Sequence, residues 1–407
     1  MNFVETLLGK LRVVALASLA ALVAVAGAPS VRAEDGVTND EIVVGAIGAL
    51  TGPLAFVGAP GRDGLSIGFD EINKKGGVNG RKIRMIFEHA SSPAESIAAV
   101  KKLVEQDKVF VLILASGSTG AAAAADYVRQ TGVPTYNLFG STPIIRNPFA
   151  ANVFHGAIVT IDNAALALIS QIYDGGYQAK KVGVLAGTYA FPQATLKAVE
   201  EAMKTKKIDY VVEQFDQSAR DYTSQLVSFA KAKVDAILIL GSFSEAGFAI
   251  KQAKDMGMKD VRFVVDGSAV NRAIVPIIGD ADGIRGYFNG PYFPGQNAKP
   301  IQDFEATLKA FLGGTMPQGR PNAYDVIGYG SAFVVAQAIQ GAGKNPTRQS
   351  LIDAWSNLKD AGPAKMGGFP ITFPESFTAS DHQGNKSLGG TTVKDGEWGV
   401  VRIITGP

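Results

Sequence analysis

Short apolar runs alternate with amphipathic segments along most of this 407-residue chain. The short runs are rich in valine, isoleucine and leucine and have the length of β-strands, whereas the segments between them repeat apolar residues at helical spacing. The expected strands are residues 42–46, 82–87, 109–114, 134–137, 181–185, 210–213, 234–240, 262–265 and 399–404. Helices are expected near residues 60–75, 94–106, 120–131, 161–174, 192–205, 222–231, 244–256 and 323–340. This order predicts an α/β fold with mainly parallel sheets that carry helices on both faces.

The alternation of strands and helices occurs twice, once before about residue 158 and again from about residue 180. A long helix that starts near Asp162 separates the two halves. Even without its N-terminal segment, 1–33, the chain is longer than one hydrophobic core usually serves. We therefore expect two lobes of similar architecture. Residues 362–396 are rich in glycine, proline and polar residues, and the pattern predicts no clear element there.

The N-terminal segment, 1–33, has the pattern of a secretory signal peptide. Lys10 and Arg12 precede an apolar run at 13–28, and small residues ending at Ala33 suit a cleavage site. The alternative is a membrane anchor, but a spanning helix needs about 20 apolar residues and this run is shorter. No later segment is long and apolar enough to span a bilayer. We therefore expect a periplasmic protein that is not inserted in the membrane once it is processed.

Charge and cysteine content narrow the possible partners. Removal of residues 1–33 leaves 36 Lys+Arg and 36 Asp+Glu, so the mature chain is formally neutral. Nucleic acid is not an expected partner, because its recognition needs a basic face that neutralises phosphates. The chain has no cysteine, so neither disulfides nor a cysteine-linked lipid anchor are expected. We expect a freely diffusing monomer.

Residues 64–68, GLSIG, match the letters of the GxSxG nucleophile elbow of α/β hydrolases. The elbow requires a sharp turn from a strand into a helix at the serine. Here the apolar positions around Ser66 place the motif inside a helix that ends near Gly76. The pattern therefore favours a protein that is not an enzyme. A secreted hydrolase remains an alternative, and it predicts ester turnover that Ser66→Ala abolishes.

Other candidate motifs give no support for a metal or a cofactor. His89, His155 and His382 lack the spacing of a metal site such as HExxH. Two glycine-rich runs, residues 76–82 and 341–344, do not complete the GxxxxGK[ST] phosphate loop and are typical of helix ends. We expect neither a metal nor a cofactor.

Two polar loops follow neighbouring predicted strands. Residues 116–120, SGSTG, lie between a buried strand and an alanine-rich helix. The amides of that helix's first turn, with the hydroxyl of Ser118 or Thr119, would bind a carboxylate. The alternative is an ordinary N-cap, in which a hydroxyl satisfies its own helix. A second loop, residues 139–143, would lie beside the first at the carboxyl edge of the sheet, where open α/β folds bind ligands.

Several segments resemble the leucine/isoleucine/valine-binding family of type 1 periplasmic binding proteins, which deliver solutes to ABC importers. The similar segments are LTGPLA at 50–55 with Gly58, EIN at 71–73 running into GGVNG at 76–80, the Ser118-Thr119 loop, and GVP at 132–134 leading to STP at 141–143. The pattern covers essentially the whole mature chain. The resemblance implies a small-molecule ligand and an ABC transporter permease as partners.

The resemblance also implies how the chain is divided. Two Rossmann-like lobes would be joined by three crossing segments and would close on a ligand held between them. On this basis residues 36–158 with about 291–365 form the first lobe, and residues 159–290 with about 366–407 form the second.

The resemblance further implies which side chains contact the ligand. Ser118 and Thr119 fall where the family binds a carboxylate, and Ser141 falls where a threonine hydroxyl commonly helps. Phe139 takes the place of a small residue whose carbonyl contacts the ammonium in amino-acid binders. The remaining wall positions are Phe56, Val57, Phe191, Phe243 and Tyr324. For each phenylalanine, ordinary packing within the lobes is the alternative.

The class of ligand depends on Asp266. Amino-acid binders usually place an acid after the strand that here ends at Val265, and Asp266 is the candidate for that counter-charge. A buried ammonium without a partner costs several kcal/mol, whereas each hydrogen bond to a carboxylate contributes roughly 1.5–3 kcal/mol. We therefore predict a monocarboxylate with an apolar or aromatic body. A hydrophobic or branched-chain amino acid is the second possibility, and a receptor for a membrane signalling partner would use the same fold.

Overall fold

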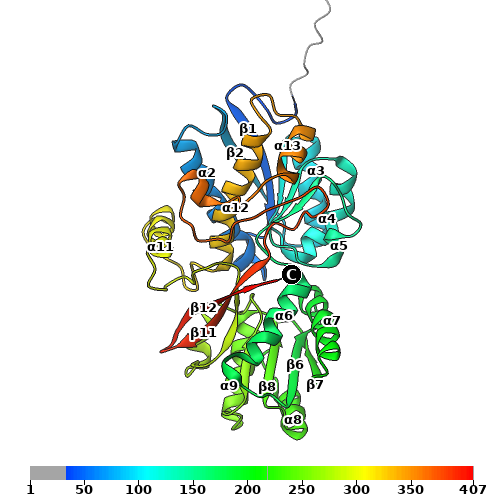
Figure 1. Ribbon diagram of the computed structural model, residues 1–407, viewed down its shortest axis with the longest axis vertical. Helices are drawn as coiled ribbons and strands as arrows, with labels where there is room; N and C mark the ends of the chain where they lie inside the picture. The colour runs from blue at the N-terminus through cyan, green and yellow to red at the C-terminus, as the bar shows by residue number, and fades with distance from the viewer. Residues whose placement is uncertain (1–33, 218, 407) are drawn as a thin grey trace, which may run out of the picture. The chain divides into compact units, whose positions relative to one another are not determined.

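The structure is a computed structural model that describes residues 34–217 and 219–406. The expected signal peptide, residues 1–33, lies outside the described residues. Two sheets organise the described chain, a five-stranded sheet in the order β2-β1-β3-β4-β5 and a seven-stranded sheet in the order β12-β11-β10-β9-β8-β6-β7 (Figure 1). This confirms the predicted α/β fold with mostly parallel sheets.

All neighbouring strands of the five-stranded sheet are parallel. Its strands are β1 (Glu41–Gly48), β2 (Lys82–His89), β3 (Val111–Leu114), β4 (Thr135–Asn137) and β5 (Val153–His155). The helices that accompany it are α2 (Ala55–Lys74), α3 (Pro93–Glu105), α4 (Gly117–Thr131), α5 (Pro143–Arg146), α12 (Ala323–Gly341) and α13 (Arg348–Ser356). We call this part the first lobe.

The seven-stranded sheet forms the second lobe. Its parallel strands are β6 (Lys181–Gly187), β7 (Asp209–Phe215), β8 (Ala236–Leu240), β9 (Arg262–Val265) and β10 (Arg285–Phe288). Two antiparallel strands extend it, β11 (Ser387–Lys394) and β12 (Glu397–Thr405). Its helices are α6 (Ile161–Ile172), α7 (Ala190–Thr205), α8 (Thr223–Ala232), α9 (Phe243–Asp255) and α10 (Ile274–Ile278). The remaining elements are α11 (Lys299–Phe311), η1 (Asp174–Gly176) and η2 (Pro363–Met366).

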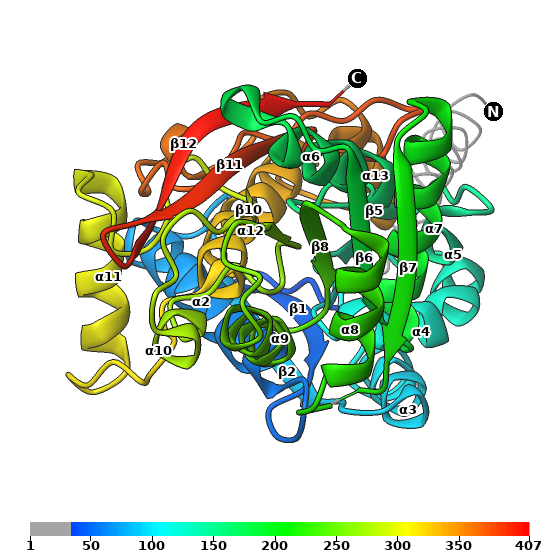
Figure 2. The same ribbon diagram turned by 90° about the horizontal axis from the view of Figure 1, so that it is seen from below.

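Helices cover both faces of the second sheet, which explains why its central strand β8, AILIL, is apolar at every position. In β8, Leu238 packs with α6 and α7 on one face, whereas Ile237 and Ile239 pack with α8 and α9 on the other. Figure 2 shows α6 and α7 together on one side of β6 and β8. Because successive residues of a strand point to opposite faces, a strand buried on both sides needs an unbroken apolar run.

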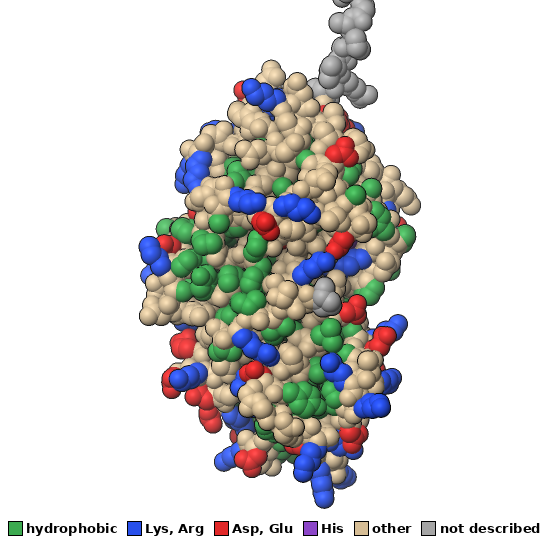
Figure 3. Space-filling view, viewed as in Figure 1, with side chains coloured by type: hydrophobic (Ala, Val, Ile, Leu, Met, Phe, Trp, Pro, Cys, Tyr) green, Lys and Arg blue, Asp and Glu red, His purple; other side chains and the backbone are tan. Residues whose placement is uncertain are grey.

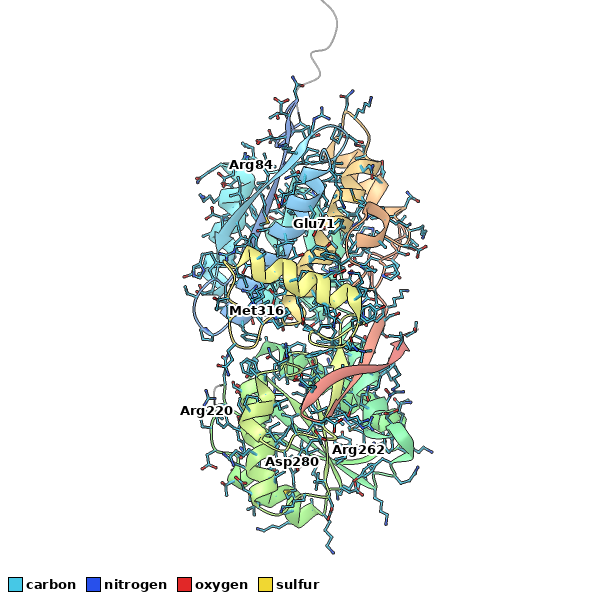
Figure 4. All side chains as sticks on the ribbon, turned by 90° about the vertical axis from the view of Figure 1, so that its left-hand side faces the viewer. Glu71, Arg84, Arg220, Arg262, Asp280 and Met316 are labelled. Atoms are coloured by element: carbon cyan, nitrogen blue, oxygen red, sulfur yellow. The ribbon has the colours of Figure 1, made fainter. Side chains whose placement is uncertain are left out.

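Helices α2 and α12 pack against each other closely enough to require glycine. A Cβ on Gly64 would lie 2.2 Å from the backbone oxygen of Asp325, and a Cβ on Gly328 would lie 2.5 Å from the backbone oxygen of Gly61. Further along, Tyr329 of α12 donates a hydrogen bond of 2.9 Å to Glu71 of α2, which Figure 4 labels. The first turns of both helices border the site described below.

The GLSIG motif at residues 64–68 belongs to this helix contact. Ser66 lies in the interior of α2, and its hydroxyl donates to the carbonyl oxygen of Arg62 at 2.8 Å. No strand-to-helix turn stands at this serine, since α2 already begins at Ala55. The glycines of the motif are explained by the approach of α12, so the motif needs no catalytic explanation.

The sequence pattern did not predict three strands, the short β5 and β10 and the eight-residue β11. Strand β5 has three residues, β10 is RGYF, and β11 is SLGGTTVK with two adjacent glycines. Such segments lack the length or the β-branched composition that identifies a strand. They form because each pairs with a neighbour that is already in place, β11 with both β10 and β12.

The segment before β11 packs on the first lobe, although the sequence-based division assigned residues from about 366 onward to the second. Glu375 is hydrogen-bonded by Tyr136 of β4, and the ring of Phe377 packs edge-on against Phe154 of β5. The chain reaches the second sheet only after Asn385, whose side-chain amide donates to the Ala157 carbonyl at 2.6 Å. Periodicity could not place this crossing, because the segment has little regular structure.

The described surface is mixed in character. On the face shown in Figure 3, lysine and arginine side chains are interspersed with aspartate and glutamate, and apolar side chains gather beside α11. None of the helices within residues 34–406 combines the length and the apolar composition required to cross a bilayer.

Candidate ligand-binding site

A cavity of about 380 Å³ lies among the loops that follow the carboxyl ends of strands from both sheets. The first lobe contributes the segments after β1, β3 and β4. The second lobe contributes the segments after β6, β8, β9 and β10. In an open α/β sheet this edge is where successive loops diverge and leave a crevice, so the location agrees with the general rule for ligand sites.

The structure brings together nine of the ten residues that the sequence singled out. Those that line the cavity are Phe56, Val57, Ser118, Thr119, Phe139, Ser141, Phe191, Phe243 and Tyr324. The tenth, Asp266, is not part of the cavity wall, although its neighbours Gly267 and Ser268 are.

The start of α4 presents backbone donors to this cavity. Gly117, with φ +68°, turns the chain in a left-handed conformation that favours glycine, and the Ser116 side chain does not cap the helix. The backbone N–H groups of Ser118 and Thr119 make no hydrogen bond to any group in the described chain. Amides in this position bind anions well, because the helix dipole adds to their own polarity.

The Ser118 hydroxyl joins the two polar loops instead of capping its own helix. It accepts a hydrogen bond from the backbone N–H of Ser141 at 3.1 Å, and it lies 3.4 Å from the Ser141 hydroxyl. The ordinary N-cap explanation for this motif therefore does not hold. The two hydroxyls and the amides of Ser118 and Thr119 form one polar corner of the cavity.

Helix starts and one acidic side chain, Glu245, set the electrostatic character of the cavity. The starts of α2, α4 and α7 all border it, and none has a side-chain cap. Among the residues that line it there is no lysine, arginine or histidine. An anionic group would therefore be stabilised by backbone amides and hydroxyls rather than by an ion pair.

Aromatic rings form another part of the cavity wall. Phe56 of α2 meets Phe243 of α9 edge to face, with 6.1 Å between ring centroids. Tyr324 packs edge-on against Phe56 at 5.9 Å and against Phe139 at 5.0 Å. Because Phe56 belongs to the first lobe and Phe243 to the second, this cluster holds the two lobes together across the cavity. It also offers a surface suited to an apolar or aromatic body.

Asp266 stabilises the backbone of two loops behind the cavity wall. It is fully buried, and its carboxylate accepts hydrogen bonds from the backbone N–H of Gly241 at 2.7 Å and from the N–H and hydroxyl of Ser268 at 2.7 and 2.6 Å. Burial raises the pKa of Asp266 to about 6 despite these donors. The carboxylate thus ties the loop after β8 to the loop after β9.

The sequence interpretation missed several polar residues of the wall, of which Glu245 and Asn289 are the most informative. Glu245 accepts from the backbone N–H of Ser242 at 2.8 Å and from the Tyr189 hydroxyl at 2.8 Å. The Ser-x-x-Glu spacing of a capping box could have revealed it. Asn289 follows β10, is 6% exposed, and its Oδ1 has no hydrogen-bond partner within the described residues. Nothing in the sequence pointed to Asn289, because β10 was not recognised.

Comparison with known proteins agrees with this architecture. A family model described as periplasmic binding protein matches residues 41–397. The leucine-, isoleucine-, valine-, threonine- and alanine-binding protein of Pseudomonas aeruginosa is 27% identical over 269 residues, which cover 65% of this chain and 70% of that protein.

Two solved structures share the fold. A branched-chain amino acid transporter substrate-binding protein from Streptococcus pneumoniae, in complex with isoleucine, has a TM-score of 0.74 at 23% identity and covers 90% of this chain and 99% of its own. A solute-binding protein of an ABC transporter from R. palustris, in complex with 4-hydroxybenzoate, has a TM-score of 0.75 at 20% identity, covering 90% and 98%. The chain belongs to the leucine/isoleucine/valine-binding family of type 1 periplasmic binding proteins.

Proposed function

We propose that this protein binds a monocarboxylate with an apolar or aromatic body in the periplasm and delivers it to the permease of an ABC importer. The observation that carries the proposal is the start of α4, where the Ser118 and Thr119 amides and two hydroxyls face a cavity with no basic side chain. The protein acts as a monomer after removal of residues 1–33 and makes or breaks no covalent bond.

Two ligand classes share the carboxylate. The Pseudomonas aeruginosa relative is named for amino acids, and the R. palustris structure contains 4-hydroxybenzoate. An amino acid would also need a counter-charge for its ammonium. Asp266 lies behind the wall with three hydrogen bonds already made, and Glu245 is held by Ser242 and Tyr189. These contacts favour a ligand without an ammonium group.

The apolar part of the ligand supplies much of the affinity. Burying about 150 Å² of apolar surface against the ring cluster contributes roughly 4 kcal/mol at about 25 cal/mol per Å². Because the cavity is lined from both lobes, a ligand gains all its contacts only when the lobes are closed. The ligand shifts the equilibrium between open and closed forms by the difference between its binding free energies for the two forms. A change in the ratio of closed to open form from 1:99 to 99:1 requires about 5.5 kcal/mol. The permease then recognises the closed form.

Ser118→Ala is expected to weaken binding of the preferred ligand about 10- to 100-fold. The hydroxyl contributes a hydrogen bond to a charged group, worth about 1.5–3 kcal/mol, and it also positions Ser141. Isothermal titration with benzoate, 4-hydroxybenzoate, 3-phenylpropanoate, leucine and isoleucine measures the effect and identifies the ligand class. Tighter binding of leucine than of every ammonium-free acid would refute the proposed class.

Ser66→Ala is the matched control for this experiment. Ser66 belongs to α2 and is not among the residues that line the cavity, so this variant should bind like the parent protein. The same variant tests the hydrolase alternative, because the parent should show no turnover of p-nitrophenyl esters. Equal loss of binding in both serine variants would mean that the effect of Ser118→Ala is not local.

A further inference from the structure

A carboxyl group is buried beneath the segments that connect the two lobes. Glu375 is 1% exposed, and both of its carboxyl oxygens lie within hydrogen-bond distance of the Tyr136 hydroxyl, at 2.8 and 2.7 Å. Within the described residues no lysine, arginine or histidine forms an ion pair with it. The ligand site does not use this group, so its position needs another explanation.

Tyr136 connects Glu375 to the first crossing segment, residues 156–160, between β5 and α6. Its hydroxyl lies 3.4 Å from the Ser331 hydroxyl of α12, and the nearby backbone of Ala157 acts to lower the raised pKa of the phenol. Its ring stacks on Trp355 of α13 with 5.4 Å between centroids. Tyr136 therefore links the two parts, because the first crossing segment packs against its hydroxyl and the same hydroxyl is hydrogen-bonded to the carboxyl of Glu375.

The third crossing segment, residues 382–386, lies against the same group. A Cβ on Gly384 would be 2.5 Å from Oε2 of Glu375, and a Cβ on Gly156 would be 2.2 Å from the Tyr136 hydroxyl. The two segments are themselves joined, since the Gly384 N–H donates to the His155 carbonyl at 2.8 Å. Crossing segments absorb the backbone rotations when lobes move. The Glu375–Tyr136 pair is therefore packed against the parts of the chain that must bend.

Apart from the Tyr136 hydroxyl, whose hydrogen bond acts to lower the pKa of Glu375, no group among the described residues around the pair stabilises a negative charge on it. Helices α12 and α13 face it with Ser331 and Trp355, neither of which titrates. The other elements near the pair carry several titratable groups. They are His155 of β5, Arg146 of α5, Asp381 and His382 near the third crossing segment, and Lys359 and Asp360 next to Ala361, which forms a β-bridge with Glu375. Burial lowers the pKa of both histidines, so they are neutral at pH 7. Arg146 donates to Gln383 instead of Glu375.

Burial raises the pKa of Glu375 from 4.5 to about 8, so the carboxyl is protonated at neutral pH. The folded-state pKa is above that of the unfolded chain. The stability contributed by the neutral group is therefore complete below about pH 4.5 and is lost as pH rises to about 8. Ionising a carboxyl that is 1% exposed is costly unless water reaches it, and separation of the crossing segments from Glu375 would admit water.

We propose that protonated Glu375, bonded to Tyr136, anchors the first and third crossing segments, and that its ionisation shifts the protein toward the open arrangement of the lobes. The anchor would make closure, and with it ligand retention, sensitive to alkaline conditions. The inference concerns the hinge alone and does not depend on which ligand the cavity takes.

The absence of cysteine makes a direct test possible. Gln130→Cys on α4 and Lys231→Cys on α8, both exposed and one in each lobe, provide two unique sites for spin labels. Pulsed electron spin resonance of the ligand-free protein then gives the distance distribution between lobes from pH 6.5 to 9.5. We expect the parent distribution to move toward longer distances with a midpoint near pH 8.

Two variants separate this inference from a general effect of pH. Glu375→Gln keeps the shape of the side chain without a charge, and its distribution should stay constant across the range. Tyr136→Phe keeps the stacked ring but removes the hydroxyl, and it should show the longer distances already at pH 7. Near-ultraviolet circular dichroism confirms that each variant is folded. Identical shifts in the parent and in Glu375→Gln, or no shift in the folded parent, would overturn the proposal.

Discussion

Gly64→Ala is expected to destabilise the protein by about 3 kcal/mol, as measured by urea denaturation. In an isolated helix alanine is more favourable than glycine by about 1 kcal/mol, so helix propensity alone predicts that the variant is more stable. Here the added methyl group would lie 2.2 Å from the backbone oxygen of Asp325 and 2.7 Å from the backbone nitrogen of Tyr329. Backbone atoms cannot rotate away, so α2 and α12 must separate, and overpacking of this kind costs about 1–3 kcal/mol or more beyond the lost propensity gain.

Ser66→Ala serves as the neighbouring control on the same helix. Among the described residues the Ser66 hydroxyl bonds only to the Arg62 carbonyl of the same helix, so the expected change in the free energy of unfolding is within about 0.5 kcal/mol. A stability gain in Gly64→Ala would show that the helices can adjust at no cost, and it would remove the packing explanation for the glycines of the GLSIG motif. Ligand affinity offers a second measurement, because α2 and α12 position Phe56 and Tyr324.

Arg320→Ala is expected to lower the free energy of unfolding by about 3–5 kcal/mol at pH 7. Arg320 donates to both carboxyl oxygens of Asp325 and, at 2.9 Å, to Asp63, and both acids are almost completely buried. Removing the Arg320 cation leaves the Asp325 carboxylate buried without an ion-pair partner among the described residues. Breaking a buried ion pair in this way is strongly destabilising, because the remaining charge is uncompensated. Asp63 keeps its contact with Arg62.

The pH dependence of this variant distinguishes the mechanism from simple loss of packing. Burial raises the pKa of Asp325 even with Arg320 present, and the variant should raise it further. The difference in the free energy of unfolding between the parent protein and Arg320→Ala should therefore become smaller as pH falls and Asp325 becomes protonated. A deficit that is the same at pH 5 and pH 8 would contradict this explanation.

Arg62→Ala is the matched control for Arg320→Ala. The Arg62 side chain is 40% exposed and pairs with the same Asp63 from the solvent side. Exposed ion pairs contribute about 0–1 kcal/mol, so the free energy of unfolding of the control should fall only slightly.

Arg320→Ala should also weaken ligand binding. Asp325 accepts a hydrogen bond from the N–H of Asn322, and the Asn322 side chain in turn donates to the Phe56 carbonyl at the cavity.

Local sequence patterns were sufficient to predict much of the secondary structure and part of the binding site of this protein. The alternating runs predicted most strands and helices, because a strand buried on both faces and an amphipathic helix each leave a clear periodicity. The SGSTG loop was visible because a helix start after a buried strand has a defined chemistry. Nine candidate residues came from that chemistry together with family resemblance, and the structure places them around one cavity.

Tertiary structure alone decided the rest. Strands β10 and β11 exist because neighbouring strands pair with them, and Asn289 reaches the cavity only through β10. Asp266 followed the expected strand but its short side chain is held by Gly241 and Ser268 behind the wall. Tyr136 and Glu375 are 239 residues apart in the chain. No local pattern records such a contact, because it depends on how separate elements pack and not on the preference of either segment.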